Sequence, residues 1–425
     1  METLRFLLVT TFYPPYHIGG DAVHVRYLAN ALAARGHEVH VEFAPEAFRL
    51  KRPRAAPSKG PADSVELHPI PSRFGRALPL AAYVLGRSRG TSRFHADLVR
   101  KVSPDVIHHH NISLLGLGVL ERRSSARVLY TAHDYWLRCP RSDLFKYGRY
   151  PCDRPTCARC AIASRRPPQL WRLGGLLRSL KALDCAIAPS DFMRRAIQDF
   201  VPCPVVHIPN FAPDPNPEGP LSAPDGYYLY VGVLEAHKGI RELAAAIPKS
   251  GDTSLAVAGH GSLLPHLRRL EASGANIHAR GWMDPHDLAP LYRRARALVL
   301  PSLSHENAPL AAIEAMSWGT PLLVSRRGGL EELLHKGRSG RSFEPTPLDI
   351  ADALARFDRE NLPERLRSGA RACYETFHNP EAYLSAYLTV ATASPGEPPA
   401  PAPGALGLPD QSPAPGTRAT GEGPT

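Results

Sequence analysis

The feature that most constrains the fold is an alternation of short apolar runs with helical patterns, repeated in two series along the chain. Each apolar run is continuous, as expected for strands buried on both faces of a parallel sheet. The first series has its runs at residues 4–10, 37–43, 104–110, 126–132, 183–190 and 205–209, and the second at 227–234, 253–259, 275–281, 297–302 and 321–325. Two consecutive series predict an α/β protein made of two Rossmann-like, doubly wound domains that face a cleft.

The segments between and after the two series set the expected domain boundaries. Residues 211–226 are rich in Pro, Gly and Asp and are predicted to be a linker. The first domain is expected at 1–210 and the second at 227–375, with a crossover helix at about 376–393 that returns to the first. Residues 394–425 contain nine Pro and six Gly. Such a segment cannot bury a core, so it is predicted to be a disordered tail.

The distribution of apolar residues indicates where in the cell the chain is expected. No apolar run approaches the ~18 residues that span a bilayer. The N-terminal run is short, is broken by Pro14 and Pro15, and is followed by no small-residue cleavage site of a signal peptide. A cytoplasmic location is therefore expected.

Charge is concentrated in one segment of the first domain. Residues 49–101 hold twelve Lys or Arg against three acidic residues, together with the apolar stretch LPLAAYVLG. Two interpretations remain: an anionic membrane surface as partner, with the protein peripheral at the inner face of the membrane, or a solvated basic face. Nucleic acid is not an expected partner, because the basic segment lacks interleaved aromatic residues and no recognition motif is present.

The densest motif follows the run at 297–302 and reads HENAPLAAIEAMSWGTPLLVS. Glu306 and Glu314 stand eight residues apart, and Pro309 is expected to open a helix between them, because a first-turn N–H has no partner within the helix. Glu306 then lies in the loop before the helix, and Glu314 about two turns inside it, among apolar residues. A buried carboxylate needs a partner. Two solvated glutamates are the alternative interpretation.

The start of that helix offers a site for a nucleotide sugar. Free backbone amides and the partial positive charge of a helix N-terminus favour a diphosphate, and the expected amide donors are those of Asn307, Ala308 and Leu310. A carboxylate accepts hydrogen bonds from hydroxyls, so Glu314 is predicted to hold the ribose diol and Glu306 the sugar. Ligands of open α/β sheets bind at the carboxyl ends of strands, where this loop is expected.

An ordered series of motifs resembles the retaining glycosyltransferases of family four, which have the GT-B fold. It includes FYPPYHIGGDAVHV, DVIHHHN, YTAHDYW, APSDFMRR, YLYVGVLEAHKGI and PSLSHENAPLAAIEAMSWGTP, and runs from about residue 4 to residue 390. The resemblance implies a retaining glycosyltransferase with a nucleotide-sugar donor, a UDP- or GDP-sugar. In the family the N-terminal domain handles the acceptor, which we expect to be a lipid-linked or polysaccharide precursor.

The resemblance also assigns roles on the donor side. Lys238, in EAHKGI, matches the lysine that grips the donor diphosphate, whereas the arginine expected five residues earlier is Val233 here. One cation of the family pattern is therefore missing. The chain contains no D-x-D sequence, and no cofactor is expected to be required for catalysis. By resemblance, attack occurs on the front face of the sugar, with the protein supplying orientation and charge stabilisation.

Four residues of the N-terminal half complete the expected site. Gly19 and Gly20 follow the first strand, and glycine lets the backbone approach a ligand closely; by resemblance their loop closes over the donor diphosphate. His133 matches a histidine that contacts the donor sugar, and Asp134 is expected to orient it or its loop. The alternatives are an ordinary pair of turn glycines and a structural histidine.

A cluster of cysteines follows this histidine. Cys139, Cys152, Cys157 and Cys160 have the spacing C-x12-C-x4-C-x2-C, and four thiolates can bind zinc tetrahedrally. The segment contains few apolar residues and several turn formers, so it needs a stabilising element such as a cross-link or a bound metal ion. Two interpretations remain open: one structural zinc ion, or thiols that are free or redox-labile.

Three other functions fit parts of the sequence. A sugar-nucleotide epimerase shares the GT-B fold but needs no acceptor. A nucleic-acid-binding protein would fit the net charge of +11. A catalytically silent sensor would bind a nucleotide sugar without turnover, but the presence of both Glu306 and Glu314 argues against it.

Overall fold

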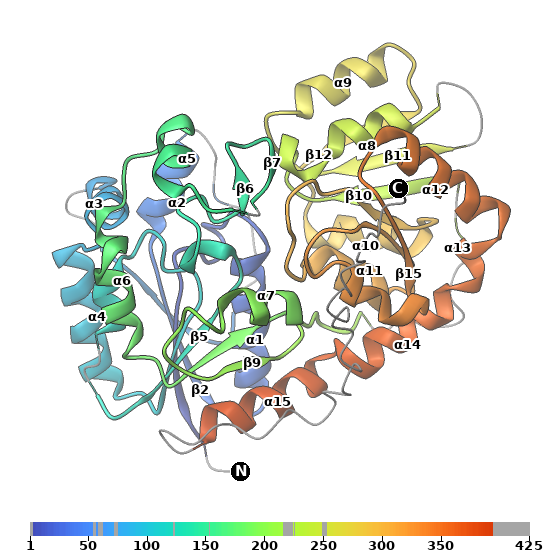
Figure 1. Ribbon diagram of the computed structural model, residues 1–425. Coiled ribbons are helices and arrows are strands. Elements are labelled where there is room, and N and C mark those ends of the chain that lie inside the picture. The colour runs from blue at the N-terminus through green and yellow to red at the C-terminus, as the bar shows by residue number, and fades with distance from the viewer. Residues whose placement is uncertain are drawn as a thin grey trace, which may run out of the picture.

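The computed structural model describes residues 3–393, except 54–56, 58–62, 72–74, 122–123, 153, 216–223, 225 and 249–252. The expected tail at 394–425, and residues 216–223 and 225 of the expected linker, lie outside the described residues. The described chain forms two α/β units side by side, each built on one parallel sheet (Figure 1). The predicted fold class is confirmed.

The N-terminal unit is built on a seven-stranded sheet with the order β3-β2-β1-β4-β5-β8-β9, in which every neighbouring pair is parallel. Its central strand is completely buried from Phe6 to Val9, as its continuous apolar run predicts for a strand covered on both faces. The strands are β1 (Arg5–Val9), β2 (Glu38–Phe43), β3 (Glu66–Pro69), β4 (Val106–His109), β5 (Arg127–Thr131), β8 (Cys185–Ala188) and β9 (Val205–His207). The helices are α1 (Gly20–Ala34), α2 (Pro45–Lys51), α3 (Ala77–Leu85), α4 (Arg89–Val102), α5 (Cys157–Ala163), α6 (Gly175–Leu180) and α7 (Asp191–Ile197), with 3-10 turns η1 (Leu117–Leu120), η2 (Tyr135–Leu137) and η3 (Leu170–Leu173).

The C-terminal unit is built on a six-stranded parallel sheet with the order β12-β11-β10-β13-β14-β15. Its strands are β10 (Tyr227–Val231), β11 (Ser254–Ala258), β12 (Ile277–Gly281), β13 (Leu298–Leu300), β14 (Leu322–Ser325) and β15 (Gly340–Phe343). Its helices are α8 (Ile240–Ala246), α9 (Leu264–Ala272), α10 (Pro285–Arg294), α11 (Leu310–Ser317), α12 (Pro347–Arg359), α13 (Leu362–Arg365) and α14 (Arg367–Phe377), with 3-10 turns η4 (Ala236–Lys238) and η5 (Glu331–Gly337).

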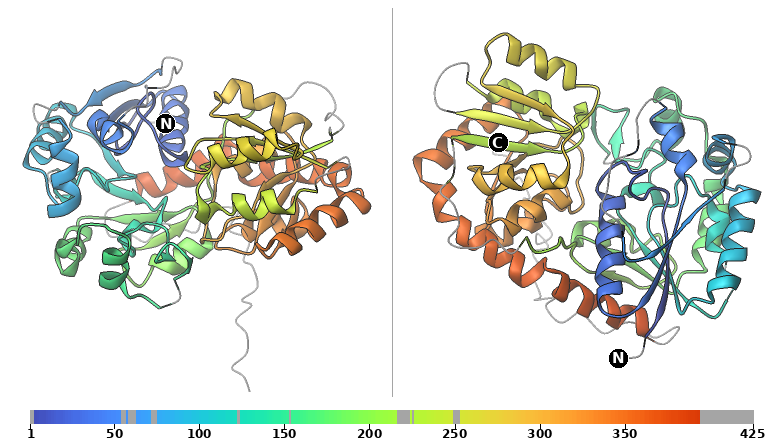
Figure 2. Two further views of the ribbon diagram at one scale, coloured as in Figure 1. Left: turned by 90° about the horizontal axis from the view of Figure 1, so that it is seen from above. Right: turned by 180° about the vertical axis from the view of Figure 1, so that it is seen from behind.

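The last helix, α15 (Pro380–Thr392), returns to the N-terminal unit (Figure 2). Tyr383 and Tyr387 are buried with Phe6 in one apolar cluster, and Arg127 of β5 donates to the carbonyl of Val390 at 2.7 Å. We propose on this basis that residues 376–393 belong to the N-terminal domain, with the boundary between domains at 211–226.

Three local features differ from the expectations or were not predicted. The edge strands β3 and β15, with the sequences ELHP and GRSF, carry no continuous apolar run because each is only partly buried. The segment after β14 contains the 3-10 turn η5 in place of an α-helix, and His335 and Lys336 in it have φ of 45° and 60°. A small antiparallel hairpin, β6 (Phe145–Lys146) with β7 (Tyr150–Pro151), stands outside both sheets in the cysteine-containing segment.

Candidate active site

A cleft of about 800 Å³ lies between the two units, and residues of both line it. The carboxyl ends of β10, β11 and β13 line it, as do residues that follow β4 and β5, as expected for ligand sites of open α/β sheets. All ten residues predicted to bind the donor or take part in catalysis are among the residues that line it: Gly19, Gly20, His133, Asp134, Lys238, Glu306, Asn307, Ala308, Leu310 and Glu314. The sequence therefore selected residues that the fold brings together from both halves.

Two helix N-termini lie close together in the lining of the cleft. Helix α1 begins at Gly20 and α11 at Leu310. A Cβ atom on Gly20 would lie 3.7 Å from the Leu310 side chain, and Gly19 has a φ of +91°, which favours glycine. Each N-terminus presents free amides and a partial positive charge, so the part of the cleft that they line suits an anion such as a diphosphate.

Glu306 is held by a cation and a hydroxyl. Lys238 donates to Glu306 Oε1 at 2.6 Å, and Ser302 Oγ donates to the same oxygen at 2.5 Å. Burial raises the pKa of Glu306, but the Lys238 charge and the two hydrogen bonds outweigh burial and hold that pKa below its usual value. The carboxylate is therefore ionised and fixed in the cleft. Ser302 was not predicted, although it lies in the proline-serine end of the apolar run.

Glu314 is held by two tyrosines that the sequence did not identify. Tyr27 of α1 donates to Oε1 at 2.9 Å, and Tyr292 of α10 donates to Oε2 at 3.0 Å. Burial raises the pKa of Glu314 above its usual value, and the two phenolic hydrogen bonds offset this rise only in part. Helix α11 begins at Leu310 with Pro309 as its N-cap residue, so Glu314 lies just beyond the first turn and not two turns inside. A carboxylate can accept about four hydrogen bonds, which leaves room for a ligand.

His133 is part of a buried group of histidines. Its Nε2 lies 2.9 Å from Nδ1 of His110, and the His24 ring centroid is 5.0 Å from its own. Burial lowers the pKa of His133 to about 3, so the imidazole is neutral at physiological pH. Ring nitrogens of the three histidines lie within 4.8 Å of one another, close enough for a metal ion; the hydrogen bond between His110 and His133 accounts for two of them. His110 was not assigned to the expected site, and its contact with His133 joins it to this group.

Two carboxyl groups line the N-terminal side of the cleft. Asp134 Oδ1 accepts a hydrogen bond from the Trp136 amide at 2.8 Å and so caps η2. Burial, and to a smaller extent the charge of Asp21, raise the pKa of Asp134 to about 7, although the Trp136 amide hydrogen bond lowers it. Asp21 itself accepts from Asn111 at 2.8 Å, and burial raises its pKa. Asp21 and Asn111 were not predicted, because the resemblance gives neither of them a role, although both stand in motifs that carry it.

Asn307 connects the two units behind the cleft. Its side-chain amide donates to the carbonyl of Ala132 at 2.9 Å, and its Oδ1 accepts from Ser190 at 2.7 Å. The Ala308 carbonyl accepts from Asn210 at 2.8 Å. These contacts fix the backbone that precedes α11. Val233, which replaces the arginine of the family pattern, also lines the cleft.

The four clustered cysteines stand in and around the β6–β7 hairpin and α5, and all are free thiols. Cys139 is buried, Cys152 and Cys160 are half-buried, and Cys157 is exposed. The structure does not show that these four cysteines bind zinc. Within the described part of the chain, the groups whose ligand atoms all lie within 4.8 Å are His24, His110 and His133, and His40, Glu66 and His68.

Two models of known protein families match the two units that form the cleft. A family model described as Glycosyltransferase Family 4 matches residues 18–213, and one described as Glycosyl transferases group 1 matches residues 225–358. The two matches cover the N-terminal and C-terminal units in turn. This chain is a GT-B glycosyltransferase of the family-four type. It uses a nucleotide sugar as donor.

Relatives of this glycosyltransferase act on different acceptors. Glycogen synthase of Mycobacterium tuberculosis is 29% identical over 394 residues, which cover 83% of this chain and 84% of the relative. A GDP-mannose-dependent alpha-(1-6)-phosphatidylinositol dimannoside mannosyltransferase of the same species is 35% identical over 133 residues, 31% of this chain and 34% of the relative.

Solved structures support the fold of the glycosyltransferase. Sucrose-phosphate synthase from Thermosynechococcus elongatus has a TM-score of 0.67 at 21% identity and covers 89% of this chain and 96% of its own. HepE of Anabaena, solved with UDP and glucose, has a TM-score of 0.64 at 15% identity and covers 92% and 100%. At these identities the likeness concerns the fold alone. In the described residues, no helix combines the length and the apolar character needed to cross a bilayer.

Proposed function

We propose that this glycosyltransferase transfers its sugar with retention of the anomeric configuration, and that its acceptor is a lipid-linked or polysaccharide precursor at a membrane surface. The observation that carries the proposal is the 2.6 Å pair of Lys238 and Glu306, in a cleft that two helix N-termini also line. A cation and free amides suit the donor diphosphate. A carboxylate fixed by that cation suits the hydroxyls of the sugar attached to it.

In the proposed reaction, the acceptor hydroxyl attacks C1 of the sugar from the face on which the diphosphate leaves. The bond from C1 to the phosphate oxygen breaks with its electron pair on that oxygen, the bond from C1 to the acceptor oxygen forms, and the acceptor proton passes to the leaving phosphate. Lys238 and the amides at the starts of α1 and α11 stabilise the charge that grows on the diphosphate. Glu306 and the neutral His133 orient the sugar, and Glu314 holds the ribose.

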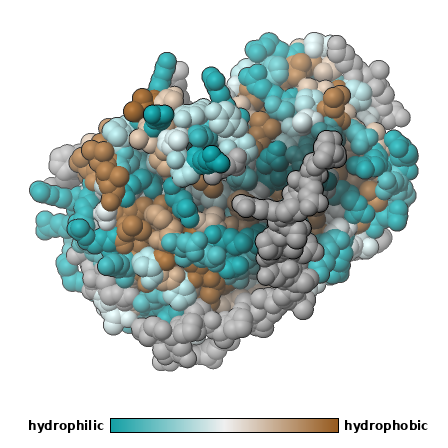
Figure 3. All heavy atoms as spheres, in the orientation of Figure 1, coloured by the Kyte–Doolittle hydropathy of each residue, from teal (hydrophilic) through white to brown (hydrophobic). Residues whose placement is uncertain are grey.

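Surface chemistry supports an acceptor at a membrane. Leucines of α3 and η3 are exposed, and Trp171 of η3 donates to the Tyr83 carbonyl of α3 at 3.1 Å, so the two elements lie side by side. We call this the leucine patch: Leu80, Leu85, Leu170 and Leu173, which are 48%, 68%, 71% and 88% exposed. Hydrophobic side chains gather at this end of the N-terminal unit, near the labels α3, α5 and α6 (Figures 1 and 3).

Exposed cations stand near the leucine patch in the sequence. Arg89 and Arg93 of α4 and Arg178 of α6 are exposed, and they lie close along the chain to leucines of the patch. Exposed leucines beside cations suit an anionic lipid surface. One relative, by its name, mannosylates a phosphatidylinositol dimannoside, and a lipid-linked acceptor would bring this chain to a membrane as well. The N-terminal unit is also the side that the resemblance assigns to the acceptor.

Donor identity and stereochemistry test the proposal. Thermal unfolding with a panel of UDP- and GDP-sugars should show one donor that stabilises the protein, because a ligand at about 100 times its dissociation constant adds roughly 2.7 kcal/mol. Proton NMR of the product should then show the same anomeric configuration as the donor. An inverted product would overturn retention, and release of free nucleotide without any acceptor would favour the epimerase.

A further inference from the structure

Residues 139–166, here called the cysteine segment, form a lobe of the N-terminal unit with little apolar core. Of its described apolar side chains, Phe145 and Ala161 are buried besides Cys139, whereas Ile162 is 75% exposed. The segment consists of the β6–β7 hairpin, the short helix α5 and the connecting turns. Hydrophobic burial therefore contributes little to its order, and another source of stability is needed.

The backbone in and just before the hairpin also indicates that the segment needs a further source of stability. Ser142, Leu144 and Tyr147 have φ of 66°, 45° and 56°, a region that residues other than glycine seldom adopt. Such conformations cost on the order of 1–3 kcal/mol each and persist only where the surroundings hold them. Three of them within six residues require a constraint that the sparse packing of this segment does not supply.

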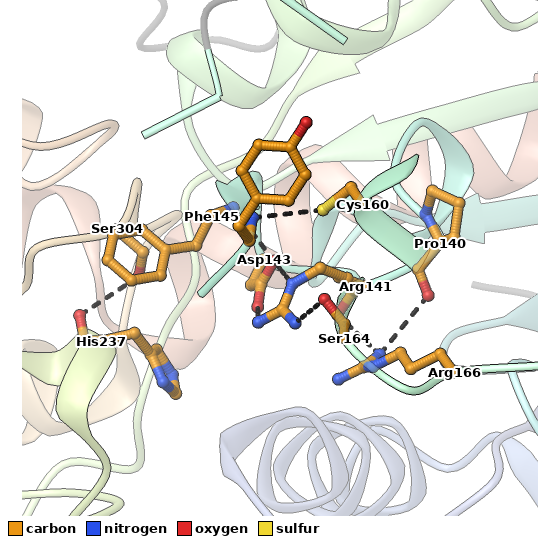
Figure 4. A network of polar contacts seen from close by, with 10 residues as sticks. Pro140, Arg141, Asp143, Phe145, Cys160, Ser164, Arg166, His237 and Ser304 are labelled. Atoms are coloured by element: carbon orange, nitrogen blue, oxygen red, sulfur yellow. Dashed lines mark hydrogen bonds and ion pairs between the residues drawn. The ribbon is translucent and has the colours of Figure 1, made fainter. Parts of the chain in front are cut away.

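Backbone contacts hold the cysteines of the segment around the β6–β7 hairpin. The Cys152 amide donates to the Leu144 carbonyl at 2.8 Å, and the Cys139 carbonyl accepts from the Ser142 amide at 2.9 Å. The Tyr147 amide donates to the Cys160 sulfur at 3.2 Å (Figure 4). Amide hydrogen bonds of this kind orient and stabilise a thiolate that binds a metal. The sulfurs must still draw together, since they form no group within 4.8 Å in the described chain.

We propose that Cys139, Cys152, Cys157 and Cys160 bind one zinc ion, and that this ion, by fixing the cysteine segment, governs how tightly the cleft binds its donor. Four thiolates in tetrahedral geometry are a closed structural zinc site, with no position left for a substrate. Binding releases the thiol protons to solvent. The coupling to the donor rests on the proposed function, whereas the metal site does not.

A chain of contacts leads from the cysteines to the cleft. Arg141 donates to Ser164 Oγ, one turn beyond Cys160, at 2.7 Å, and forms an ion pair with Asp143 at 2.8 Å (Figure 4). Asp143 lines the cleft. It also accepts from the Phe145 amide at 3.0 Å. The segment thus places a carboxylate of its own at the edge of the cleft.

The same segment touches the loop that carries Lys238. The Phe145 ring lies 6.4 Å from the ring of His237, centroid to centroid, and Figure 4 shows Phe145 beside His237 and Ser304. His237 is the residue before Lys238, and its carbonyl accepts hydrogen bonds from the amides of Leu303 and Ser304 at 2.9 and 3.2 Å. If the cysteine segment loses its order, the loop that carries Lys238 loses its contact with Phe145.

The first test counts metal and thiols in the full chain, purified without added metal. We expect about one zinc per chain by elemental analysis, and a loss of most of it in Cys160→Ser. Cys203→Ser is the matched control, because that half-buried thiol lies outside the segment and its loss should leave the zinc content unchanged. Less than about a tenth of an equivalent of zinc, with all four thiols free to titrate, would overturn the site.

The second test measures the coupling in the wild-type chain, so that it does not depend on a variant that fails to fold. A chelator removes the zinc, circular dichroism checks that the two sheets persist, and calorimetry measures the affinity for UDP and GDP before and after. Roughly tenfold weaker binding, restored by zinc, is expected. Unchanged affinity would overturn the coupling and leave the metal site. A zinc-loaded protein that binds neither nucleotide would instead count against the proposed function.

Discussion

The phenol of Tyr27 donates a 2.9 Å hydrogen bond to Glu314 and so joins α1 of the N-terminal unit to α11 of the C-terminal unit. Tyr292 holds the other oxygen at 3.0 Å. The carboxylate proposed to bind the ribose is therefore positioned before a donor arrives. A ribose diol has to share this carboxylate with Tyr27, which reaches it from the opposite side of the cleft.

Glu314→Ala should abolish donor binding while the fold survives. Hydrogen bonds to a charged group contribute about 1.5–3 kcal/mol each, so the loss of two to the ribose diol weakens UDP or GDP binding by at least roughly a hundredfold. Calorimetry on the variant, with thermal unfolding to check the fold, measures the effect. Tyr27→Phe is the matched control and should retain donor binding. Donor affinity that is unchanged in Glu314→Ala would exclude the proposed role.

The Tyr27–Glu314 contact also shows where the sequence stops being informative. Periodicity places Tyr27 on a helix, and a motif singles out Glu314, but nothing in either pattern fixes how one unit sits against the other across 287 positions of sequence. His110 is a similar case, because its role depends on the distance between the ends of two neighbouring strands. The strands β3 and β15 were missed for another reason: an edge strand that is partly exposed does not need a continuous apolar run.

The motif residues, by contrast, were predictable because their chemistry is local. Gly19 needs a positive φ, Lys238 lies in the turn that follows a buried strand, and Glu306 precedes the start of a helix. All three line the cleft. Each expectation depended on a strand end, and the ends of parallel strands meet at one edge of a sheet.

Glu306→Ala should reduce turnover more than donor affinity. Its carboxylate is fixed by Lys238 and Ser302 and is proposed to orient the transferred sugar. Loss of a positioned polar group of this kind lowers kcat by about 100- to 1000-fold. Steady-state kinetics at saturating donor measures kcat, and calorimetry with UDP or GDP should show nearly unchanged binding. Wild-type turnover in the variant would contradict the assignment.

Lys238→Met should weaken binding of the diphosphate and leave binding of the nucleoside alone. The ammonium is the cation proposed to hold the phosphates, and a charge-assisted hydrogen bond contributes about 1.5–3 kcal/mol. We expect the affinity for UDP or GDP to fall by roughly tenfold to a hundredfold and to depend less on salt, with uridine or guanosine binding unaffected. Lys336→Met, which removes an exposed lysine of η5, is the control. Equal effects of both variants would point to a general loss of charge.

Asp134 should make the stability of the protein depend on pH in a recognisable direction. Burial raises its pKa from 3.8 to about 7, so the folded state prefers the protonated acid. The stability from this preference is fully present below about pH 4 and is lost as pH rises towards about 7. The melting temperature of the wild type, relative to that of Asp134→Asn, should therefore decrease as the pH is raised from about 4 to about 7. Asparagine retains the acceptor for the Trp136 amide, and a constant difference across the range would show that Asp134 ionises normally.

The last prediction concerns the membrane. Anionic lipid attracts a basic segment by about 1 kcal/mol per cation near the surface, and modest insertion of leucines adds to this attraction. The protein should therefore co-sediment with vesicles that contain phosphatidylserine but not with pure phosphatidylcholine vesicles, and added salt should weaken the binding.

The leucine patch predicts which side chains carry this binding. The double variant Leu85→Ser and Leu173→Ser should bind anionic vesicles less tightly, because both leucines are more than half exposed in the patch. Leu348→Ser, which changes an 85% exposed leucine of α12 in the C-terminal unit, should bind as the wild type does. If the wild type sediments with neither kind of vesicle at low salt, the basic segment is a solvated face and the acceptor reaches the cleft from solution.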